Sequence, residues 1–89
     1  MAKVSKKIRI KNPQGLHARP AAQFVKTAHK FSSEIFLKKD DQLVDAKSII
    51  NILSLALEKD IEIELSAKGD DAQQAIEELR KILEDEQGY

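Results

Sequence analysis

The sequence has no cysteine and no tryptophan, only three glycines and two prolines, and no net charge. Without cysteine there is no disulfide framework and no thiolate chemistry, a composition that fits the reducing cytoplasm. Fifteen basic side chains balance fifteen acidic ones, so there is no basic excess for nucleic acid and no acidic tail. We therefore expect a cytoplasmic protein that does not bind nucleic acid.

Long apolar runs are missing as well. The longest apolar stretch, residues 49–57, is interrupted by Asn51 and Ser54 and is shorter than the roughly 20 residues that cross a bilayer. The N-terminal lysines are not followed by the apolar core of a signal peptide. We expect no membrane insertion and no leader. With 89 residues and no repeat or linker, we expect one domain covering residues 1–89.

Apolar periodicity predicts seven elements. Alternation of apolar and polar residues predicts strands at Val4–Lys11, Glu34–Lys39, Leu43–Ala46 and Ile61–Ala67. Apolar residues at helical spacing predict helices at about Ala18–Phe31, at Ser48–Leu57, and after Asp70, which we expect to cap the last helix. The predicted fold is an α/β (α+β) open-faced sandwich of order βαββαβα, in which three helices cover one face of a four-stranded antiparallel sheet.

The stretch from Asn12 to Ala22 combines turn chemistry with two functional side chains. Proline and glycine in Asn12–Gly15 favour a turn, and Pro20 favours a helix that begins close to His17. The first amides of a helix lack internal partners and carry the positive end of its dipole. An anion at His17 would therefore meet the backbone N–H groups of Ala18 and Arg19 together with the Arg19 side chain.

This geometry predicts an activated histidine beside an anion site. The positive field favours the neutral, nucleophilic imidazole of His17, which could form a covalent intermediate with a phosphoryl group. The residues alone do not distinguish phosphate from carboxylate. The other histidine, His29, has no carboxylate or cysteine at ligand spacing and is expected to be an ordinary helix residue. We expect no metal and no cofactor.

The second predicted helix carries two further candidates. Ser48 is a natural N-cap, because its hydroxyl can accept a hydrogen bond from an amide two or three residues later. Apolar residues surround much of this short helix, more than one core-facing side requires. The excess, at Ile49, Ile50 and Leu53, predicts a partner-docking patch.

Two motifs give the chain a family resemblance. Gly-Leu-His-Ala-Arg-Pro-Ala at residues 15–21 resembles the active-site motif of HPr, the histidine-containing phosphocarrier of the bacterial phosphoenolpyruvate-dependent sugar phosphotransferase system. Lys47-Ser48-Ile49 resembles that family's regulatory serine segment, and the resemblance covers roughly Lys3 to Leu83. It implies the fold predicted above.

The resemblance also implies roles. His17 would accept a phosphoryl group on Nδ1 from phosphorylated enzyme I and pass it to enzyme II A-components, while Arg19 steadies the group. The protein would be a phosphocarrier, not a stand-alone enzyme. We expect a monomer whose partners dock on the Ile49, Ile50 and Leu53 patch.

The serine segment implies regulation. Ser48 would be a substrate of an ATP-dependent HPr kinase/phosphorylase, and its phosphorylated form could bind a transcriptional regulator. The sequence departs from the family pattern nearby, because Asn51 and Ala56 stand where glycines are common. Those changes weaken the regulatory interpretation and leave the His17 interpretation intact.

Three alternatives remain open. One is a regulatory paralogue that acts mainly by protein–protein binding through phosphorylated Ser48; relatives devoted to regulation can lack the histidine, and this chain keeps His17. A second is the nitrogen-related branch of phosphocarriers, which has its own enzyme I paralogue. The third is an anion-binding α/β domain without covalent chemistry.

Overall fold

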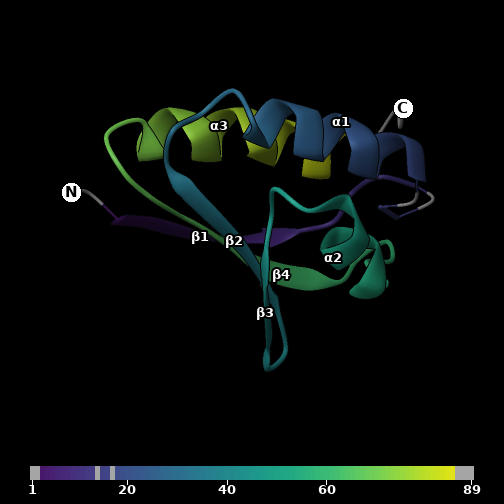
Figure 1. Cartoon of the computed structure of the whole chain (residues 1–89). Helices are drawn as coiled ribbons and strands as arrows, with labels where there is room; N and C mark the ends of the chain where they lie inside the picture. Colours follow the sequence, from purple (N-terminus) through teal and green to yellow (C-terminus); the bar gives the residue numbers. More distant parts are fainter. Residues whose placement is uncertain (1–2, 14, 17, 86–89) are drawn as a thin grey trace.

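The computed structural model of the chain describes residues 3–13, 15–16 and 18–85. In the described residues the elements are β1 (Lys3–Arg9), α1 (Ala18–Ala28), β2 (Glu34–Lys39), β3 (Gln42–Asp45), α2 (Ile49–Ser54), β4 (Glu62–Lys68) and α3 (Ala72–Leu83). The strands form one antiparallel sheet of order β1-β4-β2-β3. Helices α1 and α3 lie side by side over one face, and α2 lies beside α1 and β3 (Figure 1). The predicted fold class is confirmed.

Strict alternation in the strands creates one buried and one open face of the sheet. Ile63 and Leu65 of the central strand β4 are buried, and they pair with Ile8 of β1 and Leu37 of β2. The apolar stripes of α1 and α3 cover these side chains. The buried residues of the two helices are Pro20, Ala21, Phe24, Thr27, Ala28, Ala72, Ala75, Ile76, Leu79, Ile82 and Leu83. The predicted core face of α3 is thus buried in full.

Four elements end earlier than the periodicity predicts; one of them, β3, ends one residue earlier, at Asp45. Strand β1 ends at Arg9, because the amides of Ile10 and Lys11 bond to carbonyls beyond the ladder, those of Ile61 and Leu83, each at 2.9 Å. Helix α1 ends at Ala28 and continues as single turns, and α2 ends at Ser54. Just beyond α2, Ala56 has a φ of 50°, a left-handed conformation that no right-handed helix can contain.

The cap of α3 is Asp71, and the prediction of Asp70 was wrong. The Asp71 carboxylate makes no capping bond. It accepts hydrogen bonds from the backbone amides of Ser32 at 2.9 Å and Ser33 at 3.0 Å, and from the Ser33 hydroxyl. These bonds, that from the Ser33 hydroxyl first, lower the pKa of Asp71 from 3.8 to about 2. The carboxylate therefore joins the α1–β2 connection to the start of α3.

Among the described residues, no helix has the length and apolarity needed to span a membrane.

Candidate functional site

The loop before α1 packs against the connection that follows α2, where Gly15 and Leu16 contact Leu57 and Glu58. Gly15 has a φ of 72°, which favours glycine, and its amide donates to the Asn12 carbonyl at 2.9 Å. The Leu16 amide donates to the Leu57 carbonyl at 2.7 Å. A Cβ added at Gly15 would lie 2.5 Å from that carbonyl oxygen and 2.9 Å from the Glu58 Cα. The close approach and the positive φ both require glycine at position 15.

His17 lies outside the described residues, so the candidate nucleophile itself is not placed. Its neighbours in the chain are placed by the structure. Leu16 is buried, and Ala18 and Arg19, both exposed, are the first two residues of α1. Pro20 lies in the first turn of the helix, so the predicted helix start is confirmed. Within residues 3–13, 15–16 and 18–85, the amides of Ala18 and Arg19 have no acceptor and the Arg19 guanidinium has no ion pair.

Charge is distributed unevenly along a chain that is neutral as a whole. The first 33 residues contain eight of the fifteen basic residues and none of the fifteen acidic ones. Their net charge of +8 is balanced by −8 in the remaining 56 residues. On and just beyond α1, the exposed side chains of Arg19, Lys26 and Lys30 are all basic. The helix that begins beside His17 therefore presents a positive surface to solvent, and a surface of this kind attracts acidic groups.

Ser48 occupies the N-cap position that the sequence predicts. Its backbone is extended, and its Oγ accepts a hydrogen bond from the Asn51 amide at 3.4 Å. The residue is half-buried, and the helix that it caps has only six residues. The capping bond is long, so the hydroxyl is weakly held.

A pair of bonds ties the residue before Ser48 to the end of α1. Lys47 Nζ donates to the Phe31 carbonyl at 2.8 Å, and the Lys47 carbonyl lies 2.9 Å from His29 Nε2. Because a carbonyl only accepts, the proton of this bond sits on Nε2. His29 is exposed, but it lies in the turn just beyond the end of α1 and not, as predicted, on the helix itself. Its structural partner, the Lys47 carbonyl, could not be identified from the sequence.

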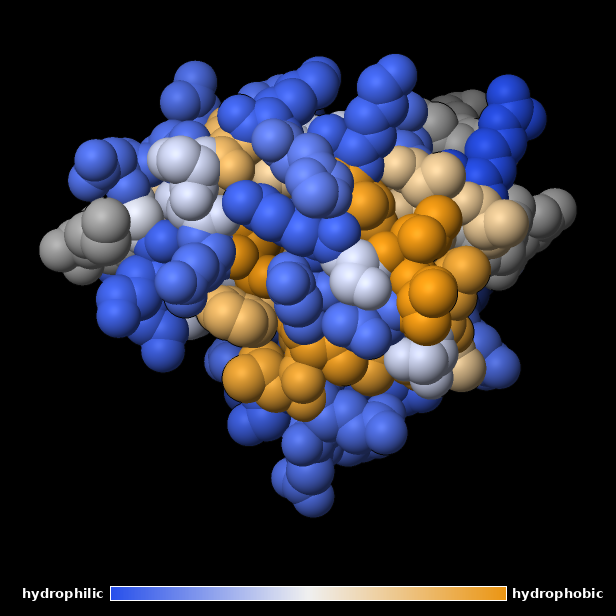
Figure 2. Space-filling model, in the orientation of Figure 1, coloured by the Kyte–Doolittle hydropathy of each residue, from blue (hydrophilic) through white to orange (hydrophobic). Residues whose placement is uncertain are grey.

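The predicted docking residues form exposed apolar surface on α2. The side chains of Ile49, Ile50 and Leu53 are 37%, 76% and 42% exposed, while Ile52 of the same helix is buried. Figure 2 shows this surface as the orange area at the position of α2, with a second orange area near β3, where Leu43 is 60% exposed. These three apolar side chains of α2 are thus accessible to a partner and are not buried in the core.

The C-terminal end of α2 is bound by a lysine that sequence reasoning missed. Lys39 Nζ, at the end of β2, donates to the carbonyls of Leu55 at 2.8 Å and Ala56 at 3.2 Å. A cation at the end of a helix satisfies carbonyls that have no internal partner. No periodicity could reveal this contact, because it joins residues 16 and 17 positions apart.

Metal ligands do not converge anywhere in residues 3–13, 15–16 and 18–85: no group of three or more His, Cys, Asp or Glu side chains could bind a metal ion.

The model of the family described as PTS HPr component phosphorylation site matches residues 4–85. The chain belongs to the HPr family. It is 49% identical over 76 residues to the phosphocarrier protein HPr of Buchnera aphidicola subsp. Acyrthosiphon pisum, covering 85% of this chain and 89% of that relative. It is 43% identical over 83 residues to the HPr-like protein Crh of Bacillus subtilis, covering 93% of this chain and 98% of that relative.

A solved HPr structure has the same fold. The crystal structure of HPr from Bacillus anthracis superposes with a TM-score of 0.89 at 41% identity, over 93% of this chain and 99% of that one. A structure of Bacillus subtilis Crh, with a TM-score of 0.75 at 43% identity over 93% of this chain and 95% of that one, is described as a swapped dimer. The family thus includes both HPr and HPr-like proteins, and the monomer predicted for this chain stays a prediction.

Proposed function

We propose that this HPr-family chain, as one domain of residues 1–89, is a cytoplasmic phosphocarrier of the phosphotransferase system. His17 accepts a phosphoryl group from phosphorylated enzyme I and passes it to enzyme II A-components, without a cofactor. The observation that carries the proposal is the start of α1 at Ala18, directly after His17, with the Arg19 side chain exposed beside it.

The chemistry is a phosphoryl transfer in which Nδ1 of His17 forms a bond to phosphorus as the bond to the donor breaks. Such reactions depend mainly on positioning and on stabilising negative charge. The amides of Ala18 and Arg19 and the Arg19 guanidinium supply donors for the phosphoryl oxygens. A carrier must also release the group, and one guanidinium with one helix end, without a metal, suits a group that is bound and then passed on.

Docking completes the proposal. The exposed residues Ile49, Ile50 and Leu53 of α2 and the basic residues of α1 form one apolar and one positive surface. α1 and α2 are in contact, so one partner could cover both surfaces. Partners that bind one after another need a modest interface and weak affinity, which this small patch suits.

The decisive test is incubation with enzyme I, Mg²⁺ and phosphoenolpyruvate, followed by intact mass spectrometry. We expect the wild type to gain one phosphoryl group that is labile in acid and stable in base, and His17→Ala to gain none. An unmodified wild type, or equal modification of His17→Ala, would contradict the proposal. Running the same assay with the enzyme I paralogue of the nitrogen branch decides between the two branches.

A second candidate function is regulation through Ser48 by an HPr kinase/phosphorylase, with binding of a transcriptional regulator to the phosphorylated form. Two observations support it: the Ser48 hydroxyl is weakly held in its capping bond, and an HPr-like protein, Crh, is among the relatives. We expect incubation with ATP and the kinase to modify the wild type and not Ser48→Ala. Modification of both proteins, or of neither, would exclude Ser48 as the site.

A further inference from the structure

The segment of residues 55–58, between α2 and β4, has a strained backbone at the place where it meets the site. Ala56 has a φ of 50°, a conformation that side chains with a Cβ disfavour. Such strain persists only where surrounding contacts impose it. The segment is anchored on one side by Leu55 and Leu57, which are 2% and 3% exposed.

Lys39 supplies the polar contact that imposes this turn. Its Nζ donates to the carbonyls of the two peptides that flank the left-handed residue Ala56, that of Leu55 at 2.8 Å and that of Ala56 at 3.2 Å. Lys39 is half-buried, whereas its neighbour Lys38 is exposed and lies opposite Glu64 in the register of β2 and β4. The two adjacent lysines therefore have different surroundings, and only Lys39 contacts the 55–58 segment.

The 55–58 segment in turn fixes the loop that carries His17. The carbonyl of Leu57, one residue beyond the strained position, accepts the amide of Leu16 at 2.7 Å. Gly15 lies so close to Leu57 and Glu58 that a Cβ there would collide with the backbone of both. Leu16 directly precedes His17 in the chain, so a shift of the Leu57 carbonyl would move the residue next to the nucleophile.

We propose that Lys39 is a positioning residue for phosphoryl transfer. By binding the carbonyls of Leu55 and Ala56 it orients the Leu57 carbonyl, which fixes the Leu16 amide and with it the start of the His17 loop. This inference rests on the proposed function of His17. A displacement of a reacting group lowers the rate strongly, even when the distant residue that causes the displacement touches no substrate.

The test compares Lys39→Met, which keeps the apolar stem and loses the donor, with Lys38→Met as the matched control. Phosphoryl transfer from phosphorylated enzyme I is measured at varied concentrations of each variant. We expect Lys39→Met to lower kcat by about threefold to tenfold with KM changed less than about twofold. Lys39→Arg, which retains charged donors, recovers most of the rate, and Lys38→Met matches the wild type.

Hydrogen exchange of the Leu16 amide tests the same chain of contacts without phosphate. We expect faster exchange in Lys39→Met than in wild type and Lys38→Met. If Lys39→Met folds poorly, the double variant with Ala56→Gly relieves the strain; it should recover stability and still transfer slowly. An unchanged kcat in a folded Lys39→Met, or a rise in KM alone, would overturn the positioning role.

The two proposals fail in different ways. A wild type that accepts no phosphate defeats the phosphocarrier proposal, and the Leu16 exchange rates still decide whether Lys39 fixes the loop. A phosphorylated wild type whose Lys39→Met variant shows normal kcat and normal Leu16 exchange defeats the Lys39 inference alone.

Discussion

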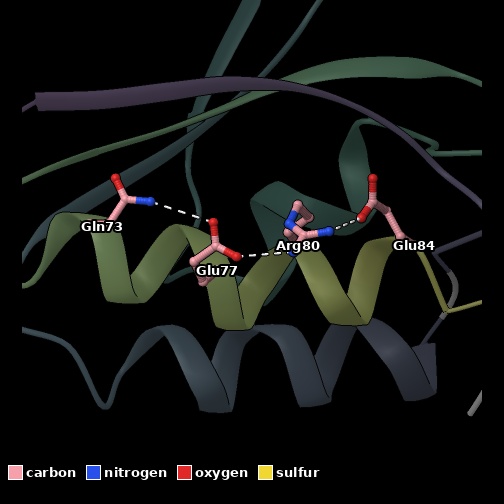
Figure 3. A network of polar contacts seen from close by, with 4 residues as sticks. All are labelled: Gln73, Glu77, Arg80 and Glu84. Atoms are coloured by element: carbon pink, nitrogen blue, oxygen red, sulfur yellow. Dashed lines mark hydrogen bonds and ion pairs between the residues drawn. The ribbon is translucent and has the colours of Figure 1, made fainter.

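Helices α1 and α3 pack side by side and bury the same kind of apolar stripe, yet their exposed faces differ in charge. On α3 the charges interact with one another: Arg80 pairs with Glu77 at 3.0 Å and with Glu84 at 2.7 Å, and Gln73 donates to Glu77 (Figure 3). The hydrogen bond and the charge of Arg80 lower the pKa of Glu77, and Glu77 and Glu84 raise the pKa of Arg80. The α1 face has no acidic residue at all.

The comparison separates a helix whose charges pair with one another from a helix whose charges all have one sign. Ion pairs three and four residues apart stabilise a helix by small amounts, and α3 uses its charges in that way. The charges on α1 have no acid on their own helix to pair with, so their field extends into solvent, where it would attract an anionic group. The same difference appears at the helix starts, since Asp71 is bound by serines of this chain and Arg19 is exposed.

The sharpest test of this difference is to remove one arginine from each helix. Arg19→Ala is expected to slow phosphoryl transfer about a hundredfold, because one donor to developing charge is lost, with little change in thermal stability. Arg80→Ala should lower the melting temperature slightly and leave transfer unchanged. Phosphoryl-transfer assays quenched at timed intervals measure the rate, and calorimetry measures the melting temperature. Equal transfer rates in the two variants would remove the functional distinction between α1 and α3.

Each of the two helices is also preceded by a glycine that admits no side chain. Gly69→Ala would bring a Cβ to 2.5 Å from Ser33 Oγ, and Gly15→Ala to the same distance from the Leu57 carbonyl. We expect each to destabilise the fold by about 1–3 kcal/mol in urea unfolding. Only Gly15→Ala should also slow phosphoryl transfer when both are assayed well below their unfolding midpoints. A comparable loss of transfer in Gly69→Ala would mean that the two loops are coupled.

The docking proposal predicts different effects for the same substitution at two exposed apolar side chains, one on α2 and one on β3. Ile50→Glu on α2 is expected to raise the KM for enzyme I about tenfold, since a charge replaces the most exposed member of the patch. Leu43→Glu on β3, a side chain 60% exposed, is the matched control and should leave KM unchanged. Both variants should unfold like the wild type. An Ile50→Glu protein with normal KM would show that partners dock elsewhere.

The Asp71 carboxylate at the start of α3 is expected to make the stability of the fold depend on pH. The folded pKa of Asp71 lies at about 2, below its ordinary value of 3.8, so the carboxylate stabilises the fold fully above about pH 4. This contribution is lost as pH falls from there towards 2, when the carboxylate is protonated in the folded state as well. Urea unfolding across that range should show a smaller decline for Asp71→Asn than for the wild type. Identical slopes would assign the acid sensitivity to other carboxylates, Glu77 among them.

Local pattern was enough for much of the fold and part of the site. The alternation in β4 and the helical spacing in α3 identify the apolar side chains that these two elements contribute to the core, because one buried face repeats every two residues or about every 3.6. Pro20 and Ser48 mark their helix starts through backbone preferences that act within one turn. The exposure of the α2 patch followed from the same counting, since a short helix cannot bury apolar residues on all sides.

Contacts between distant segments were decided only in three dimensions. The bonds from Lys39 to α2, from Lys47 to Phe31 and from Ser33 to Asp71 link residues 16 to 38 positions apart, and none has a periodic signature. The same reason explains the error at Asp70: both aspartates suit an N-cap by sequence, and only the structure shows that Asp71 occupies the cap position, with its carboxylate bound by Ser32 and Ser33. Thus the sequence specifies where apolar surface and helix ends lie, while the packing of the sheet and helices determines which polar groups meet, because such a meeting depends on where separate elements are brought together.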